Sequence, residues 1–266
     1  MREVRSHTTH SNSLKINYRV LIEVKNVTKY FEGKIAIEDI STSFEKGKIN
    51  MIIGRSGSGK TVLLKCVVGL HEVDSGDILY DGRSFVQLQH KYRKEIRKEI
   101  GMVFQGGALF DSLTVLENVM FPLEMFTEYD YYKRRKIALE TLERVNLLDV
   151  EKKYPSELSG GMQKRVAIAR AIVAKPKYLF FDEPNSGLDP ITSRLIDNLI
   201  LEIAKDENTT TVINTHDIMS VLKMGENVVF IHEGHKAWEG PKDKLFSSGS
   251  AELEDFLKAS GLDSFV

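Results

Sequence analysis

Residues 54–61 have the types and the spacing that bind the phosphates of a nucleotide. They read Gly-Arg-Ser-Gly-Ser-Gly-Lys-Thr and fit the pattern G-x-x-x-x-G-K-[ST]. The glycines lack a Cβ, so the backbone can turn sharply and bring its amides close to an anion. Lys60 supplies a mobile positive charge for the β- and γ-phosphates, and Thr61 supplies a hydroxyl for Mg²⁺. The predicted phosphate-binding residues are Gly54, Arg55, Ser56, Gly57, Ser58, Gly59, Lys60 and Thr61.

The elements that must position this loop flank it on both sides. Residues 49–53 are a short apolar run that suits a buried strand, and residues 62–70 suit a helix with one apolar side. Strand, loop and helix in this order direct the helix N-terminus at the anion. The alternative is a Gly- and Ser-rich surface turn. As a phosphate site, the loop alone leaves kinases, GTPases and ATPases open.

A second group with chemical potential is the acidic pair Asp182 and Glu183, which follows the four apolar residues 178–181. A strand that ends in Asp beside the phosphate-binding loop can hold Mg²⁺, directly or through water. The adjacent Glu183 can orient and polarise an attacking water. The alternative is a pair of surface caps, which the phosphate-binding loop in the same chain makes the weaker interpretation.

A third group is the run Leu-Ser-Gly-Gly-Met at residues 158–162, just before a predicted helix through Val166 and Ala169. Backbone amides and a serine hydroxyl at a helix start form a second device for binding an anion. Taken alone, the run would be read as a flexible loop before a helix. The two other motifs favour the anion-binding interpretation.

Composition narrows the class of protein. The chain has 266 residues, of which 42% are hydrophobic and 28% charged, and its formal net charge is −1. These values suit a globular protein and give no argument for a nucleic-acid partner. Cys66 is the single cysteine, which excludes an internal disulfide, and we expect it to be buried. The longest run without a charged residue has 11 residues, whereas a membrane-spanning helix needs about 20 apolar ones.

Strands alternate with helices in the second half of the chain, which predicts a parallel sheet covered on both faces. The expected strands there are residues 178–181, 210–214 and 228–231, the expected helices are 192–204 and 218–224, and a hairpin is expected near residue 235. Residues 20–27, 35–44 and 76–82 predict a small, mostly antiparallel sheet, with an Asp-Gly turn at its end. From Pro241 onward we expect a polar, helical segment.

The middle of the chain is predicted to be helical. Residues 114–117 fit a capping box that opens a helix, and residues 130–148 suit a second helix. A basic run at residues 90–98 allows two interpretations, an anion-binding surface or a solvated helix face, and its interspersed glutamates favour the second. Residues from about 106 to 174 are therefore expected to form an inserted helical subdomain.

Together these motifs resemble the full set found in ATP-binding cassette (ABC) ATPases. Residues 54–61, Gln105, residues 158–162, residues 180–189 and His216 follow one another in the family's order. The resemblance covers most of residues 20–240. It implies an α/β fold, a P-loop (RecA-like) ABC nucleotide-binding domain with a small antiparallel β subdomain and an inserted helical subdomain. It also implies ATP and Mg²⁺ as cofactors, and an ATPase that works as a homodimer.

The resemblance assigns roles residue by residue. Gln105 resembles the glutamine that contacts Mg²⁺ and senses the membrane partner, and Phe31, with Tyr30 as second choice, resembles the aromatic that stacks on adenine. The implied catalytic residues are Glu183 and His216, and the implied metal ligands are Thr61, Gln105 and Asp182. The implied signature loop, which acts on the ATP of the opposite subunit, is Leu158, Ser159, Gly160, Gly161 and Met162; the implied D-loop at the dimer seam is Ser186, Gly187, Leu188 and Asp189. Met162 departs from the usual Gln, which narrows the subfamily without affecting the Ser-Gly-Gly contacts.

A finer resemblance lies in residues 101–115 together with Glu117-Asn118-Val119 and Phe121-Pro122-Leu123. They are similar to the Mla-type (maintenance of lipid asymmetry) and Mce-associated lipid transporter ATPases, which also favour Met in the signature. Gly106 departs from the Ser or Asn of that group. The resemblance implies phospholipid transport through a separate integral membrane permease, with an Mce-type lipid-binding component and a small regulatory subunit as further partners. It places the chain at the cytoplasmic face of the inner membrane.

The expected division of the chain is a disordered tail over residues 1–18, an ABC ATPase domain over 19–242 and a C-terminal helical extension over 243–266. A soluble ABC ATPase of DNA repair or translation is a rival interpretation, which the lack of a long coiled coil and of a second P-loop disfavours. An amino-acid or ion importer or a cell-division ATPase stays open. We expect Leu109 and Phe110 to lie in an exposed loop on which the permease docks. The alternative is that they simply pack within the helical subdomain.

Overall fold

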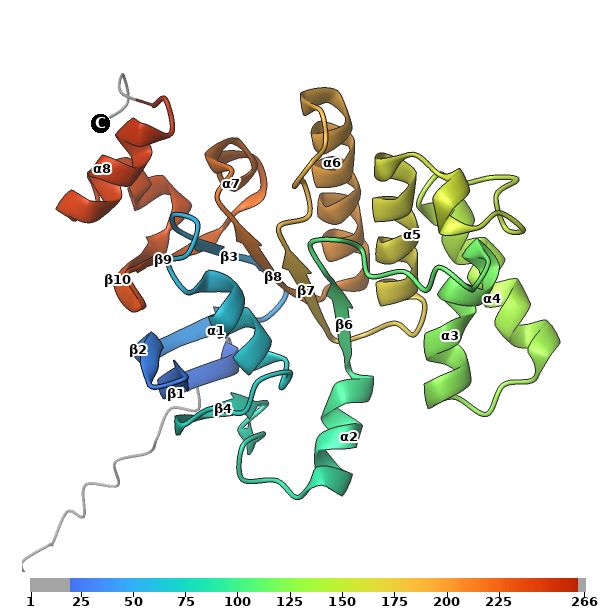
Figure 1. Cartoon of the computed structure of the whole chain (residues 1–266), viewed down its shortest axis with the longest axis horizontal. Coiled ribbons are helices and arrows are strands. Elements are labelled where there is room, and N and C mark those ends of the chain that lie inside the picture. The colour runs from blue at the N-terminus through green and yellow to red at the C-terminus, as the bar shows by residue number, and fades with distance from the viewer. Residues whose placement is uncertain (1–19, 263–266) are drawn as a thin grey trace, which may run out of the picture.

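A computed structural model describes residues 20–262, whose strands form two sheets (Figure 1). The larger sheet has the order β10-β9-β3-β8-β7-β6, and the smaller has the order β2-β1-β4-β5. The strands are β1 (Val20–Phe31), β2 (Lys34–Glu45), β3 (Ile49–Ile53), β4 (Ser75–Tyr80), β5 (Arg83–Ser84), β6 (Ile100–Val103), β7 (Tyr178–Asp182), β8 (Thr210–Thr215), β9 (Asn227–His232) and β10 (His235–Pro241). The helices are α1 (Lys60–Val67), α2 (His90–Lys98), α3 (Val115–Phe126), α4 (Tyr131–Arg144), α5 (Gly160–Ile172), α6 (Pro190–Glu207), α7 (Ile218–Met224) and α8 (Ala251–Ala259), with short 3₁₀ helices η1 (Pro155–Glu157) and η2 (Lys242–Ser247).

The larger sheet is parallel from β6 to β9, as the alternating pattern predicts, and β10 closes it as an antiparallel hairpin strand. Successive side chains of a strand point to opposite faces. In β7, Leu179 and Phe181 belong to the core that includes α5, α6 and α8, whereas Tyr178 and Phe180 belong to the core beneath α1 and the smaller sheet. Both faces of β7 are therefore covered, which explains its uninterrupted apolar sequence.

The smaller sheet is antiparallel throughout, as predicted. Its β4–β5 hairpin turns at Asp81 and Gly82, whose φ angles are 50° and 73°. Two successive positive φ angles are what a two-residue hairpin of this type requires, and Asp-Gly supplies them at low cost. Figure 1 shows this sheet beside α1, so it flanks the phosphate-binding loop.

The helical part consists of α3, α4 and α5, which pack on one another beside the edge strand β6 (Figure 1). The predicted capping box is confirmed, since Thr114 and Glu117 bond each other's backbone N–H groups. Two helices are shorter than predicted. Helix α1 ends at Val67 because Gly69 takes a left-handed conformation with φ of 74°, and α4 ends at Arg144 because Asn146 does the same with φ of 56°.

The expectation of a polar segment after Pro241 is wrong. Leu253, Phe256 and Leu257 of α8 are buried in the main core, as is Leu245 of η2. The spacing 253, 256 and 257 is that of one apolar helix face. The predicted tail 1–18 lies outside the described residues, and the three-part division of the chain stays a prediction. Within the described residues, no helix combines the length and the apolar character needed to cross a membrane.

Candidate functional site

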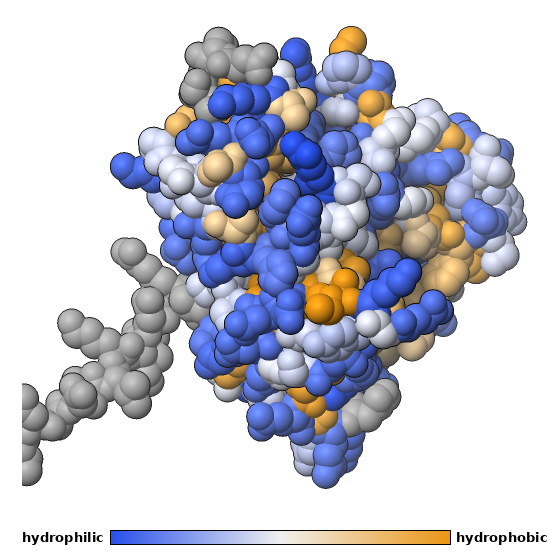
Figure 2. Space-filling view, turned by 60° about the vertical axis from the view of Figure 1, so that its left-hand side comes forward, coloured by the Kyte–Doolittle hydropathy of each residue, from blue (hydrophilic) through white to orange (hydrophobic). Residues whose placement is uncertain are grey.

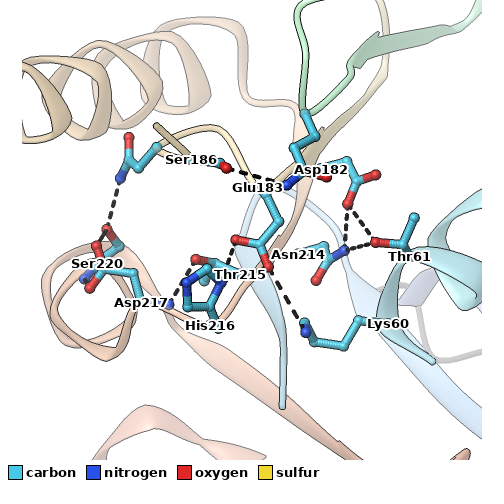
Figure 3. A network of polar contacts seen from close by, with 12 residues as sticks. Lys60, Thr61, Asp182, Glu183, Ser186, Asn214, Thr215, His216, Asp217 and Ser220 are labelled. Atoms are coloured by element: carbon cyan, nitrogen blue, oxygen red, sulfur yellow. Dashed lines mark hydrogen bonds and ion pairs between the residues drawn. The ribbon is translucent and has the colours of Figure 1, made fainter. Parts of the chain in front are cut away.

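The site lies where three neighbouring strands end at the same edge of the sheet. The phosphate-binding loop follows β3, Asp182 is the last residue of β7, and Asn214 lies directly opposite Asp182 in β8. Parallel strands bring their carboxyl ends together, and ligands of α/β proteins bind at that edge. Figure 3 shows the side chains from these elements pointing toward one another.

The loop before α1 needs glycine at Gly54. Its φ is 150°, and a Cβ there would lie 2.2 Å from the backbone oxygen of Ile231 in the neighbouring β9. Lys60 begins α1 and is buried, with its Nζ donating a 3.0 Å hydrogen bond to the carbonyl oxygen of Arg55. Burial lowers the pKa of Lys60, while the carboxylates of Glu183 and Asp182 act in the opposite direction. This ammonium is therefore held inside the loop that should receive the phosphates.

Thr61, Asp182 and Asn214 form a closed polar triad. The Thr61 hydroxyl donates to Asp182 Oδ1 at 3.0 Å, and the Asn214 amide donates to the same oxygen at 2.6 Å and to Thr61 Oγ1 at 3.0 Å. Asn214 Oδ1 is buried without a protein hydrogen-bond partner. A hydroxyl and a carboxylate are hard oxygen donors of the kind that bind Mg²⁺ together with water and phosphate oxygens. Among residues 20–262 there is no group of three or more His, Cys, Asp or Glu residues placed to hold a metal ion by themselves.

Glu183 lies beside this triad and is strained. Its φ is 48°, in the left-handed region, and its N–H donates to the carbonyl oxygen of Asn214 at 2.9 Å. Its carboxylate lies 3.9 Å from Lys60 Nζ and 2.9 Å from His216 Nδ1 (Figure 3). The Glu183 side chain is 11% exposed and that of His216 is 62% exposed. Strain of this kind persists where surrounding structure enforces it, often at functional sites.

Gln105 is turned differently from the metal ligand that the resemblance implies. Its Nε2 donates to Ser186 Oγ at 3.2 Å, so the side chain is bonded to the segment after Glu183 and not to Thr61 or Asp182. It nevertheless lines the same cavity of about 790 Å³ as the phosphate-binding loop, Glu183 and His216. Phe256, Ala259 and Ser260 of the C-terminal segment also line this cavity.

A buried polar network holds the segment that contains Ser186. Asn185 donates to Asp197 at 2.7 Å and to Ser220 at 3.0 Å, and Asp197 is 4% exposed. Neither this network nor the hydrogen bond by which Asn214 holds Asp182 is predicted from the sequence. The sequence shows that Asn214 lies in a β-branched strand, but it does not show that this strand pairs with the one that ends in Asp182.

The predicted signature loop is not part of this cavity. Ser159 caps α5 by accepting a hydrogen bond from the Met162 N–H, and a Cβ on Gly160 would meet only Leu188, at 3.8 Å. Of the predicted D-loop, Asp189 caps α6 by accepting from the N–H groups of Ile191 and Thr192. One chain thus brings together the phosphate-binding loop, Asp182, Glu183, Gln105 and His216, and leaves residues 158–162 apart from them.

The predicted adenine-stacking residues also lie outside the cavity lining. Phe31 and Tyr30 are each 41% exposed, and the Phe31 ring meets His71 edge-on at 5.2 Å between centroids. An exposed aromatic face near the loop remains accessible to a flat ligand. The assignment of Phe31 to adenine stays a prediction.

Comparison with known proteins identifies the family. Residues 37–186 match the family described as ABC transporter. The chain belongs to the ABC transporter family. Over 238 residues it is 38% identical to the intermembrane phospholipid transport system ATP-binding protein MlaF of Haemophilus influenzae, covering 90% of each chain. Over 239 residues it is 41% identical to the glutamine transport ATP-binding protein GlnQ of Escherichia coli, covering 90% of this chain and 99% of GlnQ.

A solved relative supports the fold and the ligand. The dimeric structure of a post-hydrolysis state of the ATP-binding cassette MJ0796, bound to ADP and Pi, superimposes with a TM-score of 0.77 at 33% identity, covering 84% of this chain and 99% of that one. The predicted fold class, the ATPase activity and the cofactors ATP and Mg²⁺ are confirmed. ABC ATP-binding domains work as dimers together with a membrane permease.

Proposed function

We propose that this ATPase lies at the cytoplasmic face of the inner membrane and powers the transport of phospholipid through a separate integral membrane permease. The relative MlaF is named for phospholipid transport and GlnQ for glutamine transport, so overall identity does not separate the two substrates. The Mla-like sequence of residues 101–123 is the one observation that favours lipid. An Mce-type lipid-binding component and a small regulatory subunit belong to the same proposal.

The segment that carries this resemblance forms an apolar groove. A cavity of about 300 Å³ lies between β6, α3 and α5, where Met102, Phe104, Phe110, Phe121 and Met125 contribute to its walls. Phe110 is 41% exposed and packs against Phe121, with 4.8 Å between ring centroids and the ring planes tilted by 56°. On the face shown in Figure 2 the surface is largely hydrophilic and hydrophobic surface is limited to a few patches. We assign this groove to the permease.

In the proposed reaction each residue of the site has one task. Lys60 and the amides of residues 54–61 hold the phosphates, and Thr61 and Asp182 would hold Mg²⁺, which would supply positive charge against the phosphates. The water oxygen attacks the γ-phosphorus while Glu183 accepts a proton from that water, and ADP leaves. His216, beside Glu183, contacts the γ-phosphate and keeps the carboxylate oriented. Gln105 leaves Ser186 to face the nucleotide when ATP is bound.

The proposed dimer completes the site. Residues 158–162 lie outside the cavity of their own chain, where Ser159 caps the N-terminus of α5, so this helix start can meet the γ-phosphate held by the opposite subunit. Residues 186–189 lie next to the signature loop and would form the seam. This arrangement makes each site depend on two chains.

The test is the identity of the complex and its cargo. The tagged chain, purified from membranes in mild detergent, should bring down an integral membrane protein and phospholipid, both identified by mass spectrometry. The reconstituted complex should move labelled phospholipid between vesicles only when ATP is present. If it moves glutamine or metal ions and ignores phospholipid, the lipid proposal is wrong, while membership in the ABC family stands.

A further inference from the structure

The segment 105–110, between β6 and α3, is fastened to helix α5 by two cations. Lys164 Nζ donates a short hydrogen bond to the carbonyl oxygen of Gln105. Arg170 donates to the carbonyl oxygens of Gly107 and Ala108, both at 2.8 Å. Helix α5 begins at Gly160, so the helix that carries the signature loop also holds the backbone of this segment.

These two cations are unusual because they bind carbonyl oxygens in a poorly solvated place. Lys164 is 7% exposed, and among residues 20–262 neither Lys164 nor Arg170 has a carboxylate within ion-pair distance. Burial lowers the pKa of both groups; for Lys164 the carboxylates of Asp182 and Glu183 act in the opposite direction. A buried cation without a counter-ion costs stability. Arg170 is only partly buried, so this cost falls mainly on Lys164, and stability alone gives little reason for a lysine at that position.

The segment itself has one well-defined conformation. Gly107 and Ala108 are both left-handed, with φ of 75° and 47°, and this places their carbonyl oxygens on Arg170. A left-handed alanine is strained and persists only where contacts enforce it. At the other end, buried Asn118 of α3 accepts from the Phe110 N–H at 2.8 Å and donates to the Phe110 carbonyl at 3.1 Å. Both ends of the segment are thus tied to the helical part of the chain.

The segment also contacts the apolar groove and the loop after Glu183. Ala108 and Phe110 line the apolar groove, and the Phe110 ring lies 5.7 Å from the Arg170 guanidinium. The Gln105 side chain reaches Ser186 in the loop after Glu183. The groove wall is therefore linked to α5 through the backbone carbonyls that Arg170 and Lys164 bind.

We propose that Lys164 and Arg170 are positioning residues that make segment 105–110 and helix α5 move as one body, so that filling the groove repositions Gln105 and the signature loop together. The connection between segment 105–110 and α5 involves residues of this chain alone. It rests on the proposed function only in the assumption that a permease fills the groove. Neither residue lines the nucleotide cavity, so both act through Gln105 and α5 and not on ATP directly.

The first test uses the full-length chain alone. Lys164→Met keeps the length and apolar stem of the side chain and removes its charge. We expect kcat for ATP hydrolysis to fall roughly 2–30-fold, the range that coupling networks carry, with KM for ATP unchanged and Tm not lowered. Amide hydrogen exchange should become faster in residues 105–110 and in residues 158–162 together. Lys164→Arg should restore most of both properties.

The matched control is Arg165→Met on the same helix. Arg165 donates to the carbonyl oxygen of Asn146 at 2.7 Å, so it holds a different loop by the same chemistry. It should leave kcat and exchange in residues 105–110 at wild-type values. Wild-type kcat and exchange in Lys164→Met, or an equal effect in Arg165→Met, would overturn the proposal. Arg170→Lys, measured in the same way, replaces Lys164→Met if that variant does not fold.

A second measurement separates this inference from the proposed function. In the complex co-purified from membranes, the ratio of ATPase rates with and without the membrane protein should fall toward one in Lys164→Met. Hydrogen exchange in the isolated chain does not involve a permease or a lipid. If the lipid assay fails but Lys164→Met speeds exchange in residues 105–110 and 158–162 together, only the transport proposal is wrong. If Lys164→Met does not change exchange in these two segments together, only the positioning role is wrong.

Discussion

Glu183 and His216 lie 2.9 Å apart, at the ends of adjacent parallel strands. The carboxylate is also 3.9 Å from Lys60 Nζ, so it lies between a cation of the phosphate-binding loop and an exposed imidazole. Its backbone is held at a positive φ by the hydrogen bond to Asn214. The Glu183 carboxylate therefore lies beside the lysine that, in the proposed function, binds the γ-phosphate.

Glu183→Gln removes the charge of this carboxylate and keeps its shape. We expect turnover to fall roughly 10²–10⁴-fold, because the proposed base can no longer accept a proton. ATP should still bind, since the phosphate-binding loop is untouched, and an ATP-bound dimer should accumulate. Steady-state ATPase assays and size-exclusion chromatography with MgATP measure the two effects.

Glu233→Gln is the control for that experiment. Glu233 lines the same cavity, and its side chain is 84% exposed with no contact to Lys60. Its loss should leave turnover near the wild-type value. Equal turnover in Glu183→Gln and wild type would show that Glu183 is not the base.

Asn214→Ala should weaken the response to Mg²⁺. Asn214 fixes Asp182 and Thr61 through two hydrogen bonds, and groups that orient metal ligands are worth roughly 10–100-fold in metal affinity. We expect the Mg²⁺ concentration for half-maximal ATPase activity to rise by that factor, with kcat recovered at saturating Mg²⁺. Asn227→Ala, which removes contacts to Glu45 and Asn50 at the opposite end of the strands, should leave this concentration unchanged. If Asn214→Ala shows the same Mg²⁺ dependence as the wild type, Asn214 does not orient the metal ligands.

Much of this architecture follows from local sequence. The loop at residues 54–61, the apolar run before Asp182 and the Asp-Gly turn each have a geometry that their residue types impose. Asn214 was missed because its partnership with Asp182 depends on strand order and register, which no local pattern contains. The apolar face of α8 was missed although Leu253, Phe256 and Leu257 have the helical spacing that should have revealed it.

Leu109 shows a different limit. It was expected to be exposed with Phe110, but it packs partly buried against the main core, and only Phe110 is exposed. In an irregular segment the direction of each side chain depends on the helices that surround it, here α3 and α5. Lys164 is similar, since a lysine on a polar-looking helix turn is normally solvated, whereas here it is 7% exposed and bonded to the carbonyl oxygen of Gln105.

Cys66 should be inert in the folded protein. It is 1% exposed, and burial raises the pKa of its thiol to about 12, with Lys29 opposing the shift. At about pH 8 only roughly one thiol in ten thousand is then ionised, and the thiolate is the reactive form. We expect iodoacetamide to leave the native chain unmodified and to label Cys66 in denaturing urea, as seen by mass spectrometry. Rapid labelling of the native chain would contradict the buried position.

Phe110→Glu should release the ATPase from its membrane partner. The exposed ring forms a wall of the apolar groove, and full burial of such a side chain contributes roughly 1.5–3 kcal/mol. A single substitution is preferable to changing Leu109 as well, because Leu109 packs against the core. Tyr132→Glu is the control, since Tyr132 is 82% exposed and lies outside the groove. Co-purification from membranes should be lost in the first variant alone, and retention in both would place the docking site elsewhere.

Mixing two inactive variants tests whether each site uses two chains. Lys60→Ala removes the phosphate charge from one half of the proposed site, and Gly160→Asp adds a carboxylate to the signature loop of the other half. The second change fits the folded chain, since a Cβ at Gly160 meets only Leu188 at 3.8 Å, whereas at Gly161 it would lie 2.6 Å from Thr192. Loss of activity in Gly160→Asp therefore reports on the opposite subunit and not on misfolding.

Each pure variant should be nearly inactive in ATP hydrolysis. The mixed dimer contains one site with both lesions and one site with neither, so activity should reappear on mixing, reduced by any coupling between the two sites. Circular dichroism melts should show that Gly160→Asp keeps the wild-type Tm. Full activity of purified Gly160→Asp as a monomer would rule out the shared site, because a monomer has no opposite signature loop to use.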